Sequence, residues 1–350
     1  MNPLIIPIFL PNLGCRERCL FCNQRATAEE APAPSFVRDF VEKSIKGLPS
    51  NGAIEKQVAF YGGSFTAMNR CDQIRYLKEI RPFLVSEVIH SIRISTRPDA
   101  LDEETLSLLK EYGVKTIEIG AQSMIDEVLF LSRRGHRAED TIFACLRIRR
   151  WGFEIGIHLM MGLPGDTCER FLWTLDQVIG LKPDFLRIHP TLVLKGSPLE
   201  ILWRQGRYTP LSLEETVQWL KKGLFKLERS SIRLARIGLQ PTGELEKHFL
   251  AGPYHAALHQ LVDSEIAFDM AKHLLQIYFE ENRPLFLCHP RDVSNLRGQR
   301  NENILNLKAR FRLKEIVIQN REDLPRGSLL LQTQKGNASI HRRDLSCHED

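Results

Sequence analysis

The 350-residue sequence has no long uninterrupted apolar run and no strong excess of one charge. None of its hydrophobic stretches approaches the ~20 residues that a membrane-spanning helix needs, so we expect no membrane partner. Its 48 basic and 43 acidic residues give a formal net charge of +5, which is weak support for a nucleic-acid partner. The first residues, MNPLIIPIFL, contain two prolines and no basic leader, so they predict a buried strand rather than a signal peptide.

The sequence also lacks the cysteine arrangement of a disulfide framework. Of its eight cysteines, five are scattered singly through apolar or mixed sequence, at positions 71, 145, 168, 288 and 347. Isolated cysteines of this kind are typical of reduced thiols in a protein core. The pattern favours a reducing compartment, and we therefore expect a cytoplasmic protein.

The other three cysteines, Cys15, Cys19 and Cys22, lie within eight residues in the stretch NLGCRERCLFCNQR. Three thiols cannot all pair in disulfides. A tetrahedral zinc site would need a fourth ligand, and no second C-x2-C or H-x3-H pair supplies one. A 4Fe–4S cluster usually has four cysteine ligands, so three would leave one iron open. Zinc and a tight turn of reduced thiols remain alternatives, but the spacing favours a cluster with an open iron.

Strand-like and helix-like segments alternate over the first part of the chain. The predicted strands are Leu4–Leu10, Gln57–Tyr61, Ile92–Ser95, Thr116–Ile119, Glu154–Leu159, Phe185–Leu194 and Arg233–Leu239. This alternation predicts an α/β fold with a parallel sheet, and six or seven such units fit a partial or complete (β/α) barrel. Reactive groups in such folds lie just past the C-terminal ends of strands. The cysteine loop and the stretches YGGSFT and STRPD fall at such positions.

The boundaries follow from changes in this pattern. We predict a barrel domain over residues 1–245, a small α+β C-terminal domain over 246–335 and a polar, disordered tail over 336–350. Within the first 245 residues, Asp102 is placed to cap a helix, and Ser212 with Glu215 forms a capping box.

The motif C-x3-C-x2-C, with the aromatic Phe21 before the last cysteine, resembles the signature of radical S-adenosylmethionine (radical SAM) enzymes. The resemblance implies that the three cysteines hold a 4Fe–4S cluster whose open iron is chelated by S-adenosylmethionine. It also implies an external one-electron donor, such as flavodoxin or ferredoxin, and release of a 5′-deoxyadenosyl radical that abstracts hydrogen from a substrate. The family's fold, a partial or complete TIM-like βα barrel, agrees with the alternation above.

Further fragments narrow the branch. They occur in one order along about residues 4–245: YGGSFT (61–66), STRPD (95–99), IEIGAQS (117–123), RRGH (133–136), HLMMGLPGDT (158–167) and PTLVLKGSPL (190–199). Together they resemble the radical domain of the elongator catalytic subunit, which modifies the wobble uridine of tRNA. They resemble oxygen-independent coproporphyrinogen oxidase more distantly. We find no glycine-rich acetyl-CoA loop to match the acetyltransferase domain of the elongator subunit.

The resemblance assigns cofactor-binding positions near the ends of the second and fourth strands and in the segment that follows the fourth. It implies that Gly62 and Gly63 hydrogen-bond the methionine amino group of S-adenosylmethionine and that Gln122 lies near this cofactor. It implies that Arg134 pairs with the methionine carboxylate, with Arg133 as the alternative if the register shifts by one residue.

Three more positions are expected to bind the cofactor. The family mostly carries an acid two residues before the position of Arg97, where it binds ribose, but this sequence has Ser95 there. An ion pair between Arg97 and Asp99 is the alternative reading of that motif. His158 follows the fifth strand, where the elongator branch has a histidine and the porphyrinogen branch an acid. A histidine satisfied within the barrel is its alternative.

Three functions remain open, and the sequence assigns no catalytic side chain. The first is an elongator-like radical enzyme with RNA as its partner, indicated also by the basic segments RIRR (147–150) and HPRDVSNLRGQR (289–300). The second is a small-molecule radical enzyme of the coproporphyrinogen oxidase type, against which Ser95 and His158 argue. The third is a non-catalytic iron–sulfur protein.

Overall fold

A computed structural model of the chain describes residues 3–15, 18–23, 30–47, 54–278, 283–333 and 336–345. The chain divides into two compact units, residues 1–211 with 232–254 and residues 212–231 with 255–350. This division differs from the linear boundary predicted at residue 245, which falls inside helix α9 (Gly243–His248). Helix α8 (Leu213–Glu228) belongs to the second unit, while strand β8 (Arg233–Ile237) belongs to the first.

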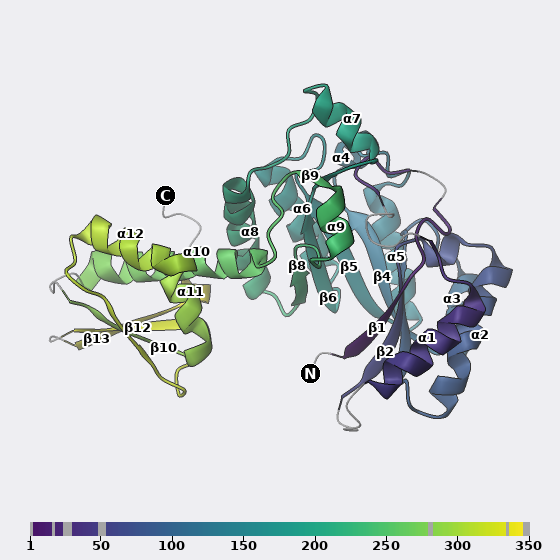
Figure 1. Cartoon of the computed structure of the whole chain (residues 1–350), viewed down its shortest axis with the longest axis horizontal. Helices are drawn as coiled ribbons and strands as arrows, with labels where there is room; N and C mark the ends of the chain where they lie inside the picture. Colours follow the sequence, from purple (N-terminus) through teal and green to yellow (C-terminus); the bar gives the residue numbers. More distant parts are fainter. Residues whose placement is uncertain are drawn as a thin grey trace. The chain divides into compact units, whose positions relative to one another are not determined.

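The first unit is built on seven parallel strands that curl into an open half-barrel (Figure 1). The strands follow chain order, β1 (Leu4–Phe9), β2 (Lys56–Tyr61), β3 (Ser91–Thr96), β4 (Val114–Gln122), β5 (Glu154–Met161), β6 (Phe185–Pro190) and β8. The predicted partial barrel is confirmed. The predicted strand Phe185–Leu194 is split, because Pro190 has no N–H to continue the ladder. Its second part, β7 (Val193–Leu194), pairs with β9 (Phe249–Ala251) instead.

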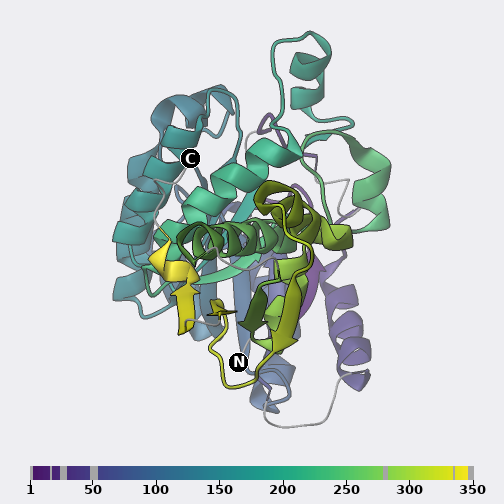
Figure 2. The same cartoon turned by 90° about the vertical axis from the view of Figure 1, so that its left-hand side faces the viewer.

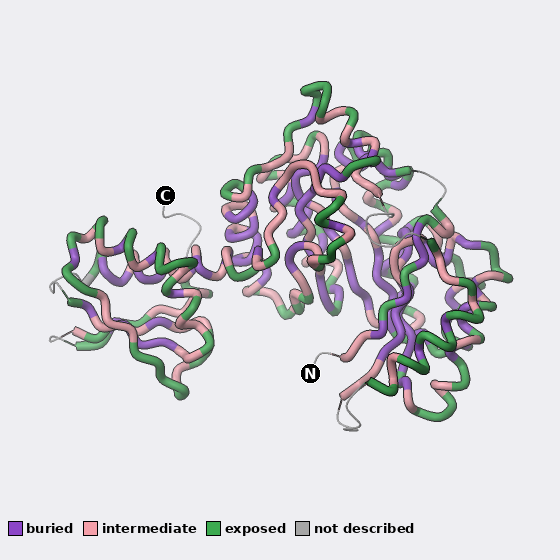
Figure 3. Tube along the Cα trace, viewed as in Figure 1, coloured by how far each residue is buried: buried purple, intermediate pink, exposed green. Residues whose placement is uncertain are grey.

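Helices cover the outer face of this sheet (Figure 1). The helices of this unit are α1 (Pro34–Lys46), α2 (Arg70–Val85), α3 (Glu103–Glu111), α4 (Asp126–Leu131), α5 (Ala138–Arg150), α6 (Cys168–Gly180), α7 (Pro198–Arg204) and α9, with a 3-10 turn at Phe65–Ala67. Of these, α7 and α9 do not cover the outer face but pack beside β7. Asp102 caps α3 as predicted, accepting a hydrogen bond from the Thr105 N–H at 2.8 Å. Buried residues run along the strands between the layers (Figure 3). Ile94, Ile117 and Ile157 there are fully buried.

The inner face of the half-barrel carries polar residues in alternation with these apolar ones. Successive side chains of a strand point to opposite faces, so the residues between the outward-facing isoleucines line the interior. They are Gln57, Tyr61, Arg93, Ser95, Glu118, Glu154, His158, Arg187, His189 and Arg236. The interior therefore contains several ionisable groups, which is unusual for a barrel core and points to a function.

Phe185 lies at the N-terminal end of β6, among these polar residues. The guanidinium of Arg93 lies 4.9 Å from the centre of its ring, and that of Arg233 lies 5.1 Å from it. Gly156 on β5 makes room for the ring, because a Cβ at that position would stand 2.3 Å from Phe185 Cζ.

The second unit has a four-stranded sheet with helices gathered on one of its faces (Figures 1 and 2). The sheet order is β11 (Val317–Asn320), β10 (Leu285–Cys288), β12 (Ser328–Thr333) and β13 (Gly336–His341). The helices are α8, α10 (Leu258–Tyr278), α11 (Val293–Arg297) and α12 (Glu302–Phe311), with 3-10 turns at Pro290–Asp292, Gln299–Asn301 and Arg342–Asp344. The capping box of Ser212 and Glu215 at the start of α8 is confirmed.

Partly buried ion pairs join α8 to the rest of this unit. Lys221 Nζ lies 2.7 Å from Asp269 Oδ2 on α10, and Arg342 pairs with both Glu228 and Asp263. The predicted disordered tail is thus structured as far as residue 345, because β13 pairs antiparallel with β12. The strand was not predicted from the sequence because its residues are mostly polar, and Ala338 is its only buried residue. Residues 346–350 lie outside the described residues.

None of the described helices has the length and apolar character needed to cross a membrane.

Replacing Gly156 by alanine tests the packing at Phe185. We expect Gly156→Ala to lower the free energy of unfolding by about 1–3 kcal/mol, since overpacking forces backbone or rotamer shifts. Gly180→Ala is the matched control, because nothing lies within 4 Å of a Cβ at that position. Urea unfolding followed by circular dichroism would measure both. Equal stability of the two variants would contradict the proposed packing.

Candidate functional site

The three clustered cysteines lie in the loop that follows β1. Cys19 is buried, Cys22 half-buried and Cys15 exposed, and none of the three is in a disulfide. Backbone hydrogen bonds hold the loop from two sides: the Leu20 N–H donates to Ser132 O at 3.1 Å, and the Leu199 N–H donates to Leu20 O at 2.8 Å. The loop is therefore fixed at the C-terminal edge of the sheet, where the sequence predicts the reactive groups.

The Gly-Gly pair of YGGSFT packs directly against this cysteine loop. A Cβ on Gly63 would stand 2.1 Å from Leu13 O, and one on Gly14 would stand 2.1 Å from Ser64 O. The Ser64 N–H donates to Leu13 O at 2.8 Å. These glycines let two backbones approach more closely than any side chain would allow. Gly63 thus has a structural role in holding the cysteine loop, in addition to the cofactor role expected for it.

Arg134 is the basic residue that reaches the cysteines. Its Nη1 lies 3.2 Å from Cys19 Sγ, its Nη2 donates to Gly120 O at 2.6 Å, and the residue is only 7% exposed. Its Nε is buried and has no hydrogen-bond partner among the described residues. Arg133 is exposed. The structure therefore brings Arg134, rather than its neighbour, to the cysteine loop.

Gln122 and Arg134 converge over Gly120. A Cβ at Gly120 would stand 2.9 Å from Gln122 Nε2 and 3.4 Å from Arg134 Nη2. Gln122 has a left-handed backbone with φ of 68°, which is uncommon outside glycine and turns the end of β4 away from a regular strand. Strained backbone of this kind clusters at functional sites.

The STRPD motif divides in two. Ser95 lines a small crevice with Leu13 and Gly63, beside the cysteine loop. Arg97 makes a two-point ion pair with Asp99, with Nε–Oδ1 of 2.9 Å and Nη2–Oδ2 of 2.8 Å. Burial raises the pKa of Asp99, but Arg97 outweighs this and lowers it overall. The structure thus shows the ion pair that the sequence offered as an alternative.

His158 points into the half-barrel and pairs with Glu118, a residue that the sequence analysis did not single out. Glu118 is completely buried and also accepts from Tyr61 Oη at 3.0 Å and from Arg93 Nη1 at 2.8 Å. Arg187 Nε lies 3.0 Å from its second oxygen. Four strands therefore place one side chain each around the single buried carboxylate of Glu118 on β4, and we call these five residues the Glu118 hub.

The charge state of the Glu118 hub follows from its contacts. Burial alone would raise the pKa of Glu118, but His158, and after it Arg187 and Arg93, lower it well below its ordinary value. Burial and then Glu118 raise the pKa of Tyr61, so its hydroxyl stays protonated and donates. One sequence signal was available: Arg93, Glu118 and Arg187 each stand between two apolar residues of a strand, in the stretches SIRIS, TIEIG and FLRIHP.

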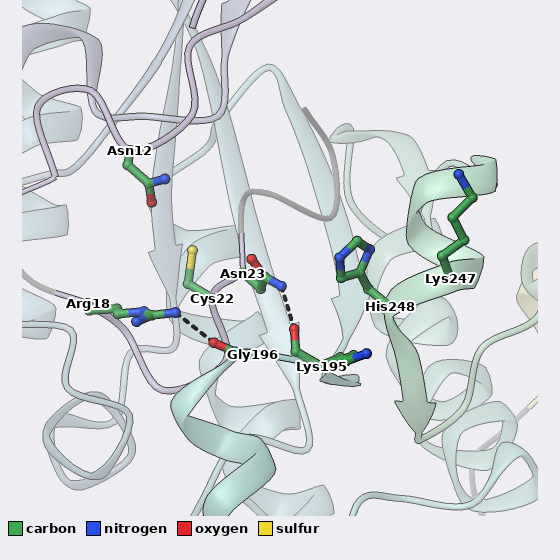
Figure 4. A pocket seen from close by; sticks show the side chains of 8 residues that line it. All are labelled: Asn12, Arg18, Cys22, Asn23, Lys195, Gly196, Lys247 and His248. Carbon is green, nitrogen blue, oxygen red and sulfur yellow. Dashed lines mark hydrogen bonds between the residues drawn. The ribbon is translucent and has the colours of Figure 1, made fainter. Parts of the chain in front are cut away.

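A cavity of about 700 Å³ opens beside Cys22 (Figure 4). It is lined by Asn12, Arg18, Cys22, Asn23, Lys195, Gly196, Lys247 and His248. Arg18 donates to Gly196 O at 2.6 Å, and Asn23 donates to Lys195 O, which ties the cysteine loop to the segment after β7. The described residues that line this cavity include three lysine or arginine side chains and no carboxylate, so the cavity suits an anionic ligand. We call it the basic cavity.

Two family models match most of the chain. The model of the radical SAM superfamily matches residues 10–178, and that of the radical SAM C-terminal domain matches residues 183–267. The chain belongs to the radical SAM superfamily. It is a radical SAM enzyme, and its cofactors are a 4Fe–4S cluster and S-adenosylmethionine.

Individual relatives place the chain in an elongator-like branch. It is 34% identical over 207 residues to the tRNA uridine(34) acetyltransferase of Methanocaldococcus infernus, covering 57% of this chain and 38% of that protein. It is 33% identical over 130 residues to human elongator complex protein 3, covering 36% of this chain and 24% of that protein. The first three curated relatives are covered over 38%, 24% and 52% of their lengths, so the chain spans at most about half of them.

The chain is also similar to a bacterial protein and to a solved archaeal structure. The chain is 28% identical over 210 residues to protein YhcC of Escherichia coli, covering 57% of this chain and 64% of that protein. Among solved structures, archaeal Elp3 from Methanocaldococcus infernus superposes with a TM-score of 0.61 at 22% identity, covering 78% of this chain and 63% of that one. This likeness supports the fold.

The side chains around the cysteine loop suit these cofactors. Among the described residues no three His, Cys, Asp or Glu side chains are grouped to hold a single metal ion. A cubane cluster instead binds each thiolate at a different iron, so its ligands need not meet at one point. The buried guanidinium of Arg134, with its unpaired Nε, is suited to an anionic cluster or to a carboxylate beside Cys19.

Replacing Glu118 by glutamine tests the Glu118 hub. We expect Glu118→Gln to lower the free energy of unfolding at pH 7 by about 3–5 kcal/mol, because the buried arginines lose their counter-charge. The ionised carboxylate stabilises the folded chain fully above its unfolded pKa of 4.5, and this contribution is lost as the pH falls further. Urea unfolding at a series of pH values from 7 into the acid range should therefore show a decreasing difference in the free energy of unfolding between wild type and Glu118→Gln.

The control for this prediction is Glu127→Gln, which removes a more exposed ion pair with Arg170. Such pairs contribute about 0–1 kcal/mol. If both substitutions cost the same, or if the stability gap did not narrow in acid, the hub would not have the charges described.

Proposed function

We propose that this radical SAM enzyme modifies RNA, with tRNA as the substrate, and that the basic cavity admits the RNA. The observation that carries the proposal is the position of the basic cavity, whose wall includes Cys22 of the cluster loop. A nucleotide bound there would lie beside the cluster loop, and its phosphates would contact Arg18, Lys195 and Lys247. The names of the relatives, which refer to tRNA uridine, support the same class of substrate.

We assign the cluster to Cys15, Cys19 and Cys22, and S-adenosylmethionine to the edge of the sheet next to them. Gly62, Gly63, Gln122 and Arg134 border that space. Ser95 lies in the crevice beside Gly63, where it takes the place of the acid usual in the family. Arg97 is paired with Asp99, and His158 is paired with Glu118. We therefore propose that Arg97 and His158 position other groups around the cofactor.

The cofactors supply the chemistry: an electron from the reduced cluster splits a carbon–sulfur bond of S-adenosylmethionine, giving methionine and a 5′-deoxyadenosyl radical that takes a hydrogen atom from the substrate. The chain's own residues bind and orient. Arg134 offsets negative charge beside Cys19, and the glycine contacts keep the cysteine loop in place. An external one-electron donor of the flavodoxin or ferredoxin type completes the reaction, and we place the enzyme in the reducing cytoplasm.

One basic segment predicted to contact RNA has another role in the structure. In RIRR, at the end of α5, Arg147 donates to Leu101 O at 2.8 Å and Arg149 donates to Lys182 O at 3.0 Å. Arg150 lies 3.6 Å from Glu103. These arginines join neighbouring crossover segments. The proposal of an RNA substrate is therefore based on the basic cavity and not on this segment.

Replacing Cys19 by alanine tests the cluster. After anaerobic reconstitution, we expect Cys19→Ala to lose the cluster absorbance and, with dithionite and S-adenosylmethionine, to form no 5′-deoxyadenosine above background. Cys71→Ala is the matched control, since Cys71 is an exposed cysteine on α2, and it should behave as wild type. Wild-type turnover in Cys19→Ala would refute the cluster assignment.

Filter binding of tRNA at several salt concentrations tests the RNA proposal. Each phosphate contact contributes about 0.7–0.9 to the slope of log affinity against log salt. We expect Lys195→Ala to weaken binding and to reduce the slope by about that amount, because its exposed side chain lines the basic cavity. Lys78→Ala, an exposed lysine on α2, is the control. Affinity that does not change with salt would count against an RNA substrate.

A further inference from the structure

A row of basic side chains crosses the inner face of the half-barrel. In the strand register His158 on β5 lies opposite Arg187 on β6, and Arg187 lies opposite Arg236 on β8. Residues in register on adjacent parallel strands point to the same face. These three side chains therefore stand next to one another inside the half-barrel, with Arg236 on the last strand of the sheet.

The two acidic residues inside the half-barrel, Glu118 and Glu154, form ion pairs with basic residues other than Arg236. Glu118 pairs with Arg93 and Arg187. Glu154 lies 3.6 Å from Arg233 and 3.9 Å from Arg93. Among the described residues no ion pair or hydrogen bond to the Arg236 side chain is formed, and its Nε is buried. The Arg236 side chain is half-buried, and partial removal of a guanidinium from water without a counter-charge is costly. The described residues thus leave one positive charge there uncompensated.

His189 provides a second unsatisfied polar group in the same region. It lies two residues beyond Arg187 on β6, on the same face, and its Nε2 is buried without a hydrogen-bond partner among the described residues. Its ring centre is 5.9 Å from that of His158. Burial, followed by His158, Arg187 and Arg236, lowers its pKa to about 3. A neutral imidazole can donate one N–H to an oxygen that accepts it.

We propose that Arg236, together with Arg187 and His189, forms a site inside the half-barrel for an oxyanion of the substrate, a phosphate or a carboxylate. Both groups accept two parallel hydrogen bonds from a guanidinium. This inference rests on the proposed function in one respect, since the anionic group is taken to belong to the substrate of the enzyme. Binding of an anion at this site requires neither the cluster nor RNA. It differs from the basic cavity, because none of its residues lines that cavity.

Calorimetric titration of the reconstituted holoenzyme with inorganic phosphate, uridine monophosphate and succinate, at one fixed ionic strength, tests this site. We expect at least one of the three to bind wild type, and Arg236→Gln to weaken that binding at least tenfold. Arg236→Lys should recover part of it. Arg233→Gln, on the same strand but paired with Glu154, is the matched control and should bind within twofold of wild type.

Thermal unfolding gives a second measurement that does not depend on affinity alone. Without added anion, Arg236→Gln should unfold at the same or a higher temperature than wild type, because a half-buried charge without a counter-charge is removed. The anion that binds should raise the unfolding temperature of wild type but not of Arg236→Gln. Binding of phosphate rather than succinate, or the reverse, would identify the oxyanion.

Two results would overturn the site: no binding of any of the three anions to wild type, or equal binding by Arg236→Gln. These outcomes can be told apart from failure of the proposed function. If wild type binds an anion through Arg236 but does not bind tRNA, the RNA proposal fails and the oxyanion site stands. If tRNA binds and the anions do not, the oxyanion site alone is refuted.

Discussion

The half-barrel depends on one buried carboxylate. Glu118 is completely buried and draws together Tyr61, Arg93, His158 and Arg187 from the other strands. A charge in that position would be strongly unfavourable alone, and so would each arginine. Together they satisfy one another, and because they come from separate strands, the arrangement exists only when the whole sheet is formed. The interior of the sheet thus has a fixed polar geometry in place of an apolar core.

This geometry separates the interior into regions with different chemistry. At the C-terminal edge of the sheet, Gly63, Gln122 and Arg134 lie beside the cysteine loop, in the region that we propose for the cofactors. Deeper inside, the Glu118 hub fixes Arg187, and none of the described residues supplies a counter-charge to Arg236. Phe185, between two arginines, lies at the N-terminal end of β6. Under the two proposals made above, the cofactors would lie at the C-terminal end of the strands and an anionic group of the substrate deeper inside the half-barrel.

Sequence periodicity was sufficient for the fold, since alternation of strands and helices is a local property. The spacing of the cysteines was sufficient to identify the cysteine loop, because three thiols within eight residues fit few kinds of site. Sequence periodicity did not reveal the Glu118 hub, whose members are about 30 residues apart and meet only through strand register. The unit boundary was missed for a similar reason: α8 is held by ion pairs to residues more than 40 positions later, such as Lys221 to Asp269.

The path of the chain between the two units has a consequence for how the enzyme can be divided. Residues 212–231 leave the first unit for the second, and β8 returns before the chain departs again after residue 254. No single cut in the backbone separates the units, and removing everything beyond α9 would strip α8 of α10. The segment that bears Arg236, residues 232–254, thus continues into the neighbouring unit at both of its ends. Truncated forms should be designed with that double attachment in view.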